Sequence, residues 1–179
     1  MLTQRTIREV EAGFASAVVT AMGEEGDLVA IRLARGCRCF AAWSGEEVLA
    51  YGWLSSGPEW IGELGREIRP AAGEAYLWNC FTLAGQRRQG HFRSLVRTIA
   101  ALVRDEGCKR LWIGGIQGTA EAALAQVGYQ PVLHIAASGD NRFVVAPAAG
   151  VDPELLAAGR RALSLEESWS FEAGPPRRH

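Results

Sequence analysis

The most regular hydrophobic pattern in the chain lies in residues 92–104, where apolar side chains recur every three or four positions and so fall on one face of a helix. The preceding residues, 75–83, are mostly apolar, which is typical of a buried strand. A short basic loop containing a glycine, residues 84–91, separates the two. The pattern therefore predicts a strand, a loop and an amphipathic helix in succession. The apolar positions of the helix are Phe92, Leu95, Val96, Ile99, Leu102 and Val103.

Weaker patterns predict the elements around this unit. Apolar residues at helical spacing indicate further helices. These are expected over residues 6–22, 59–68, 120–127 and 153–163. Short apolar runs bounded by Gly, Pro, Ser or Asp indicate strands. These are expected over residues 28–33, 37–43, 48–54, 110–116, 132–137 and 142–146.

The order of these elements indicates an α/β (α+β) fold. The strands before residue 55 follow one another closely and form an antiparallel meander, whereas a crossover through the central helix makes its two flanking strands parallel. We expect a mixed, mostly antiparallel twisted sheet of about six or seven strands around this βαβ unit, flanked by helices. A chain of 179 residues suits one domain, placed at residues 1–150. Residues 151–179 are expected to add a short helix and a mobile tail.

Positive charge is concentrated in the central unit, although the formal net charge of the chain is only -1. Residues 75–104 contain no Asp or Glu. The start of a helix presents unpaired N–H groups and the positive end of its dipole, and Gly90 lets a ligand approach the main chain closely. We therefore expect a phosphate or pyrophosphate to bind there. The arginines of this unit are Arg87, Arg88, Arg93, Arg97 and Arg104.

The loop at residues 87–92, Arg-Arg-Gln-Gly-His-Phe, resembles the Q/R-x-x-G-x-G/A loop of the GNAT acyltransferase superfamily. Arg87 and Gly90 match that pattern, and Phe92 stands where Gly or Ala is usual. The order of elements over residues 5–146 is also similar to the GNAT arrangement. The resemblance implies a GNAT-like fold and the transfer of an acetyl group from acetyl-CoA to an amine by direct attack.

The resemblance also implies which residues hold acetyl-CoA. The end of the central strand would donate and accept main-chain hydrogen bonds along the pantetheine arm, and an N–H near Phe81 would polarise the acyl carbonyl. Gln117 stands where the family often has an Asn that touches the arm. The loop would hold the pyrophosphate. The residues implied are Phe81, Thr82 and Leu83 for the arm, and Arg87, Arg88, Gln89, Gly90, His91 and Phe92 for the pyrophosphate.

Candidates for the acid–base chemistry are carboxylates near the central strand. Direct attack needs a neutral amine, so a carboxylate or a water relay has to accept its proton. Glu74 begins the central strand, and Glu63 and Glu67 precede it; the alternative for the last two is a solvent-exposed helix face. Cys80 is a further candidate, as a nucleophile with His91 as its base, against its alternative as a small buried core residue.

The position at which the family commonly has a Tyr to protonate the leaving thiolate, about four residues before Gly128, is Leu124 here. Three alternatives follow. Tyr129 could take that role, solvent could protonate the thiolate, or the protein could be a catalytically degenerate GNAT-like module that binds CoA or a partner protein without turnover.

Several other classes of function are not favoured by the sequence. Cys37 and Cys39 lack a second pair of ligands, so we expect no metal and four reduced cysteines. The basic residues are confined to one loop and helix in a chain of pI about 6.3, which does not favour nucleic acid. With no apolar run long enough for a membrane span and no signal-like N-terminus, we expect a cytoplasmic protein. The amine acceptor and the oligomeric state stay open, a dimer included.

Overall fold

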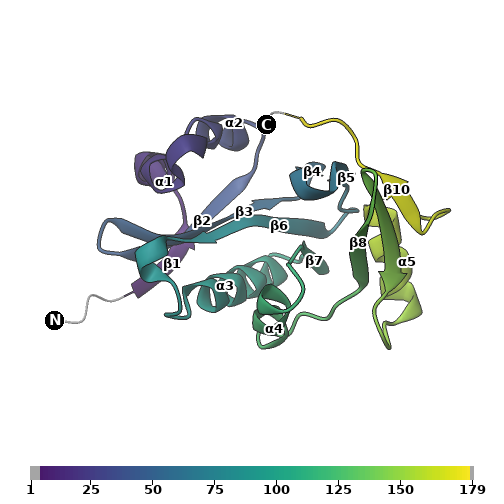
Figure 1. Cartoon of the computed structure of the whole chain (residues 1–179). Coiled ribbons are helices and arrows are strands. Elements are labelled where there is room, and N and C mark those ends of the chain that lie inside the picture. Colours follow the sequence, from purple (N-terminus) through teal and green to yellow (C-terminus); the bar gives the residue numbers. More distant parts are fainter. Residues whose placement is uncertain (1–4, 178–179) are drawn as a thin grey trace.

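A computed structural model of the chain describes residues 5–177 (Figure 1). Its centre is a five-stranded sheet with strand order β1-β2-β3-β6-β7. Only β6 and β7 pair in parallel, from Glu74 opposite Arg110 to Leu77 opposite Ile113; the other neighbours are antiparallel. The predicted mixed sheet around a parallel βαβ unit is confirmed. The strands are β1 (Arg5–Glu9), β2 (Arg38–Ser44), β3 (Glu47–Ser55), β6 (Glu74–Thr82) and β7 (Arg110–Ile113).

Helices cover both faces of this sheet (Figure 1). Val18 and Trp53 are fully buried in the core between the sheet and α1 and α2. On the other face, Leu95 and Ile99 of α3 pack with Leu77 of β6, so the apolar stripe predicted for the central helix faces the core. The helices are α1 (Ala15–Met22) and α2 (Leu28–Ala34) on one face, and α3 (His91–Asp105) and α4 (Thr119–Ala125) on the other.

The remaining strands form two smaller sheets, so the strands are not joined in one sheet of six or seven. A three-stranded sheet has the order β10-β9-β8, and β4 pairs with β5 as a hairpin. Helix α5 contacts β8. The elements are β4 (Glu59–Ile61), β5 (Arg66–Ile68), β8 (Leu133–Gly139), β9 (Arg142–Pro147), α5 (Pro153–Ala162) and β10 (Ser170–Glu172).

The segment after α5 is attached to the rest of the structure, where a mobile tail was expected. Phe171 of β10 stacks on Phe143 of β9, with ring centroids 5.1 Å apart. Beyond it, the N–H of Gly174 donates to the carbonyl of Gly65 at 2.6 Å. Residues 178–179 lie outside the described part of the chain, and the division of the chain at residue 150 stays a prediction.

Two predicted elements in the N-terminal part are corrected. Within residues 6–22 the first part is β1, because Ile7 and its neighbours pair along β2, and tertiary pairing overrides the helical spacing. The expected strand over residues 28–33 is helix α2, whose Val29 and Arg32, three positions apart, both face the core. A short apolar run does not distinguish the two kinds of element.

The expected helix over residues 59–68 is the hairpin β4–β5. Trp60 lies opposite Glu67, and the chain turns through Gly65, whose φ of 54° is in the left-handed region that glycine adopts without strain. The four-residue spacing of Trp60, Leu64 and Ile68 therefore does not reflect one face of a helix. Leu64 lies in the turn, while Ile68 is buried in the third core cluster.

Candidate functional site: an open strand edge beside a helix start

Strand β6 has an open edge along its second half. It continues to Thr82, but its pairing with β7 ends at Leu77 opposite Ile113. Main-chain groups alternate sides along a strand, and the N–H of Leu83 donates to Leu49 of β3 at 3.0 Å. The main-chain groups of Thr82 therefore face the opposite, open side. A slot begins where β6 and β7 separate. An extended ligand could occupy this slot by pairing with the open edge of β6 as an additional strand.

A β-bulge lies at the closed end of this slot. Trp53 pairs with Trp78 and Tyr51 pairs with Phe81, so one residue of β3 faces two of β6. Asn79, in the bulge, has a φ of 45°, and Asn tolerates this left-handed conformation better than most residues. The bulge disrupts the regular alternation of β6 beside the slot.

The loop after β6 leads directly into the start of α3. Arg88 and Gly90 have φ angles of 61° and 79°, and the first helical bond runs from the N–H of Ser94 to Gly90. Within residues 5–177, the N–H groups of Arg88, Gly90 and Phe92 have no hydrogen-bond acceptor. Such a set of free amides at the start of a 15-residue helix suits an anion.

The side chains of the loop divide into exposed and buried ones. Arg87 and Arg88 are exposed; the guanidinium of Arg87 lies 5.6 Å from the ring centroid of Phe81, and its Nε lies 3.4 Å from the Thr82 carbonyl. Gln89 is exposed, with its amide 3.4 Å from the carbonyl of Gly85. His91 is buried at 5% exposure, and Phe92 packs against the α3 core. The loop therefore offers an anion two guanidinium groups and main-chain amides.

Two of the residues expected beside the pantetheine arm are placed differently. Leu83 already donates its N–H to Leu49, so it does not face the slot. Phe81 lies opposite Tyr51, with ring centroids 5.8 Å apart and 39% exposure, and therefore offers its ring rather than its main chain. Gln117 is exposed in the connection between β7 and α4. Thr82 is the residue of the expected set whose main chain faces the slot.

The structure does not support Glu74 as the base. Glu74 is buried at the opposite end of β6 from Thr82, and its carboxylate accepts hydrogen bonds from Arg110, from Trp112 Nε1 at 2.8 Å and from the N–H of Ala71 at 3.1 Å. Burial alone would raise the pKa of Glu74, but the bonds from Trp112, Ala71 and Arg110 together lower it. Its carboxylate stabilises the fold.

The other expected carboxylates do not share a helix face. Glu63 is exposed in the turn of the β4–β5 hairpin, and Glu67 forms ion pairs with Arg69 and Arg177. Within the described residues, neither carboxylate forms a hydrogen bond or ion pair with a residue of the slot. Glu59, the first residue of β4, is buried and accepts a hydrogen bond from Arg35 at 2.7 Å.

Cys80 lies beside the slot, but its environment does not favour a nucleophile. Its side chain packs against the α3 core cluster. Burial raises the pKa of Cys80 to about 12, so the thiol stays protonated at neutral pH. The alternative interpretation as a core residue is therefore favoured, and the four cysteines are free thiols, as expected.

The position of the missing tyrosine is filled by an apolar side chain. Leu124 of α4 is buried in the α3 core cluster. Tyr129 packs against the same cluster, and its hydroxyl is buried with no hydrogen-bond partner within residues 5–177. Burial raises the pKa of Tyr129, followed by the nearby Cys80, so this hydroxyl stays protonated.

Two residues at the bulge were not anticipated from the sequence. Asn79 Nδ2 lies 3.3 Å from a carboxylate oxygen of Glu25, 54 residues away in the chain. No spacing or motif relates these positions. An Asn in the middle of an otherwise apolar strand was the signal that could have indicated the bulge.

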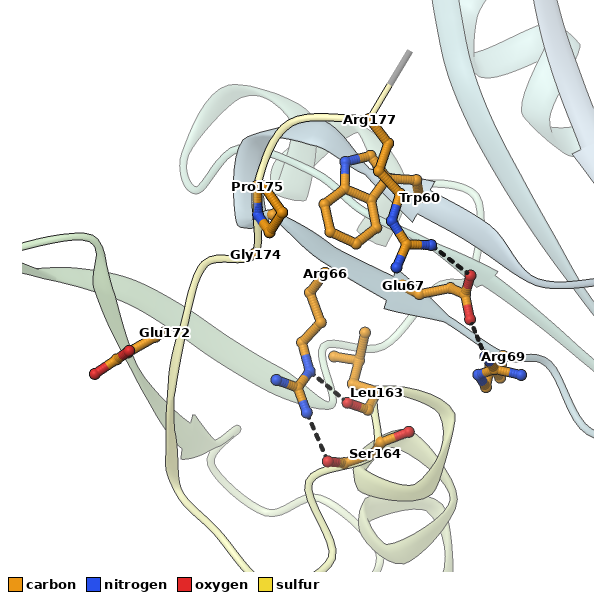
Figure 2. A pocket seen from close by; sticks show the side chains of 11 residues that line it. Trp60, Arg66, Glu67, Arg69, Leu163, Ser164, Glu172, Gly174, Pro175 and Arg177 are labelled. Carbon is orange, nitrogen blue, oxygen red and sulfur yellow. Dashed lines mark hydrogen bonds and ion pairs between the residues drawn. The ribbon is translucent and has the colours of Figure 1, made fainter. Parts of the chain in front are cut away.

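A pocket of about 350 Å³ lies elsewhere in the structure (Figure 2). It lies between the β4–β5 hairpin, the end of α5 and the C-terminal segment. Its basic side chains are already engaged: Arg66 donates to the carbonyls of Leu163 and Ser164, and Arg177 stacks on Trp60 and pairs with Glu67. The charges of these two side chains are therefore already paired or hydrogen-bonded within the protein. Trp60 lines this pocket, whereas Trp53 and Trp78 pack together elsewhere, with ring centroids 6.4 Å apart.

Among residues 5–177, no group of three or more His, Cys, Asp or Glu side chains is arranged to hold a metal ion. In the same residues, no helix has the length and apolar composition needed to span a membrane.

Comparisons with known proteins agree with this arrangement. The profile of the Acetyltransferase (GNAT) family matches residues 11–129, from before α1 to Tyr129. The sequence has no significant match among curated proteins.

Solved structures with the same fold include an acetyl-CoA complex. A GNAT family acetyltransferase from Brucella melitensis with acetyl-CoA superposes with a TM-score of 0.56 and 18% identity, over 84% of this chain and 92% of that one. An acetyltransferase from Trypanosoma brucei has a TM-score of 0.54 and 14% identity, over 71% and 93%. An aminoglycoside N-acetyltransferase in complex with CoA has a TM-score of 0.52 and 15% identity, over 70% and 91%. At these identities the likeness concerns the fold.

Proposed function

Because the chain belongs to the acetyltransferase (GNAT) family, a family of acyltransferases, we propose that it transfers an acetyl group from acetyl-CoA to an amine acceptor by direct attack. The observation that supports this most strongly is the continuity of two features. The open edge of β6 runs from the bulge at Asn79 to Thr82 and leads into free amides at the start of α3. One suits an extended arm and the other a pyrophosphate, the two parts of the same ligand.

The proposed roles follow from the position of each group. Arg87 and Arg88, with the free amides of Gly90 and Phe92, bind the pyrophosphate. The main chain of Thr82 binds the arm, once Arg87 releases the Thr82 carbonyl that it now contacts. An N–H at the bulge polarises the acyl carbonyl. When bound, acetyl-CoA supplies a thioester whose carbonyl carbon the amine attacks.

The second candidate function is a module that binds CoA or a partner protein without turnover. Leu124 in place of the expected tyrosine favours it, since no hydroxyl stands there to protonate a thiolate. The hydroxyl of Tyr129, protonated and lacking a partner within residues 5–177, favours the enzyme instead, because it packs near Cys80 at the slot.

Calorimetric titration with acetyl-CoA, combined with an assay for free thiol release in the presence of a panel of amines, tests the proposal. Acyl transfer predicts binding together with amine-dependent thiol release. Binding without release for every amine would favour the module. No binding of acetyl-CoA at all would contradict both.

A further inference from the structure

An exposed carboxylate lies over the bulge on the sheet face covered by α1 and α2. It belongs to Glu25, at the end of the short 3-10 helix Gly23–Glu25 that links these helices. Its Oε2 accepts from Asn79 Nδ2 at 3.3 Å and lies 3.8 Å from Nη2 of Arg32. Asn79 is two positions beyond Leu77, the last residue of β6 that pairs with β7. Glu25 therefore lies at the closed end of the slot.

Arg32, the ion-pair partner of this carboxylate, is buried. The Arg32 side chain is 5% exposed, against 58% for Glu25. Its guanidinium carbon lies 4.4 Å from the ring centroid of Trp78 and 5.1 Å from that of Trp53, and its Nε and Nη1 have no hydrogen-bond partner within residues 5–177. The Glu25 carboxylate therefore faces a buried guanidinium on one side and solvent on the other. Glu25 is consequently the member of the pair that an incoming molecule meets.

The bulge also turns successive side chains of β6, Asn79 and Cys80, to opposite faces of the sheet. Cys80 packs into the core under α3, whereas Asn79 turns its amide to Glu25 on the α1–α2 side. The exposed ring of Phe81 lies on this second side, against Tyr51. An exposed carboxylate on this side of the sheet suits a cationic amine and repels an acidic one.

We propose that Glu25 binds the acceptor as a protonated primary amine and takes up its proton; this rests on the proposed acetyl transfer. The ammonium gives one proton to the Glu25 carboxylate, and the freed nitrogen lone pair forms a bond to the thioester carbonyl carbon. The carbon–sulfur bond breaks, and its electron pair leaves with sulfur. The thiolate takes the second proton that the nitrogen loses, and Glu25 returns its proton to water. The products are an amide, a thiol and one proton.

The experiment compares Glu25→Gln with Glu24→Gln. Glu24 is exposed in the same 3-10 helix, so its substitution removes the same charge and serves as the matched control. Thiol release from acetyl-CoA is measured with an amine that the wild-type protein uses, together with acetyl-CoA affinity by calorimetry and thermal unfolding. We expect Glu25→Gln to lower kcat/KM for the amine at least about a hundredfold, the loss typical of a removed general base. Acetyl-CoA affinity should stay unchanged, and Glu24→Gln should stay near wild type.

Each other outcome has a distinct meaning. Equal activity of the two variants and the wild type would overturn the role of Glu25 and leave the acetyl transfer standing. A loss of acetyl-CoA affinity as large as the loss of kcat/KM would also overturn it, because Glu25 would then act on the donor. Wild-type protein that releases no thiol with any amine would refute the proposed function itself. Glu25→Gln could unfold at a lower temperature than the wild type, and Glu25→Asp, which keeps the charge, then serves as the second variant. The proposal requires Glu25→Asp to restore the unfolding temperature while its kcat/KM for the amine stays below that of the wild type.

Discussion

The Sγ atom of Cys80 lies 2.9 Å from the point where a Cβ atom on Gly52 would stand. Gly52 is the single residue of β3 that faces the two bulge residues of β6. Leu77 and Leu95 approach the same point to 3.5 Å. The absence of a side chain at position 52 is therefore what lets the bulge and its buried thiol pack against β3.

Gly52→Ala should destabilise the protein by about 1–3 kcal/mol, the usual cost of forcing a methyl group into a packed core. Urea unfolding measures it. Gly13→Ala is the control, because no atom lies within 4 Å of its Cβ position. In a Cys80→Ala background the penalty should shrink, since the Sγ atom is gone. An equal penalty in both backgrounds would show that Cys80 is not the obstacle.

Cys80→Ala should leave amine-dependent thiol release within about threefold of wild type, a change of under 1 kcal/mol. The reason is that burial raises the pKa of Cys80 to about 12. Burial also raises the pKa of Cys39 to about 12. Neither supplies thiolate at neutral pH. Rapid-quench mass spectrometry checks for an acetylated cysteine. An acetyl group on Cys80, with loss of activity in the alanine variant, would restore the covalent route.

Glu74→Gln should destabilise the protein by about 1–3 kcal/mol, because Arg110, Trp112 and Ala71 lose a charged acceptor. The variant should also change the pH dependence of stability. The pKa of Glu74 is lower in the folded state than its usual value of 4.5. The unfolded state therefore binds more protons below that pH, and the Glu74 contribution is lost as the pH falls through the folded pKa.

Urea unfolding between neutral pH and pH 3 tests this linkage. The wild-type free energy of unfolding should fall more steeply below pH 4.5 than that of Glu74→Gln. Parallel curves would mean that Glu74 does not carry the effect. Amine-dependent thiol release by the folded variant should persist, which separates a structural carboxylate from a base.

Arg88→Ala should weaken acetyl-CoA binding about tenfold or more, since a charge-assisted phosphate contact contributes about 1.5–3 kcal/mol. Arg97→Ala is the matched control: Arg97 is equally exposed but lies on α3 beyond the first turn. Calorimetry at two salt concentrations measures both. The same loss in the two variants would indicate a diffuse charge effect and contradict a specific site in the loop.

Gly90→Val should cost more affinity than Arg88→Ala. Gly90 has a φ of 79°, which a β-branched residue adopts only with strain, and its N–H is one of the free amides at the start of α3. Gly107→Val, at a φ of 91° past the other end of α3, controls for strain alone. Acetyl-CoA affinity should fall in the first variant and hold in the second. If both bind equally well, the loop amides do not contact the ligand.

The central unit could be predicted from sequence because local pattern and tertiary environment agree there. Leu95, Val96 and Ile99 recur at helical spacing and are all fully buried, and the loop with Arg87 and Gly90 does lead into the helix start. The predictions for residues 28–33 and 59–68 were wrong because local pattern and tertiary environment disagree there. Their apolar residues fit more than one period, and neighbouring strands or the sheet face decided between them.

The candidate base could not be predicted because it depends on a contact between distant segments. Glu74 was chosen for its place at the start of the strand, yet the parallel pairing with β7 brings Arg110 and Trp112 to its carboxylate. Glu25 was passed over because only the fold brings it to Asn79. The residues of the anion-binding loop and of the helix start are adjacent in the sequence. A base, in contrast, is defined by neighbours that only the fold brings together.

The extra residue in β6 reverses which positions share a face. Before it, odd positions such as Leu77 point to α3 and even ones such as Trp78 point to α1 and α2; after it, the even Cys80 and the odd Phe81 have exchanged sides. The alternation of hydrophobic positions therefore does not predict which residues of β6 share a face on both sides of the bulge. Deleting residue 79 would remove the bulge and leave Cys80 and Phe81 on their present sides, whereas a straight strand that kept position 79 would turn the Phe81 ring toward α3 and the thiol toward α1 and α2.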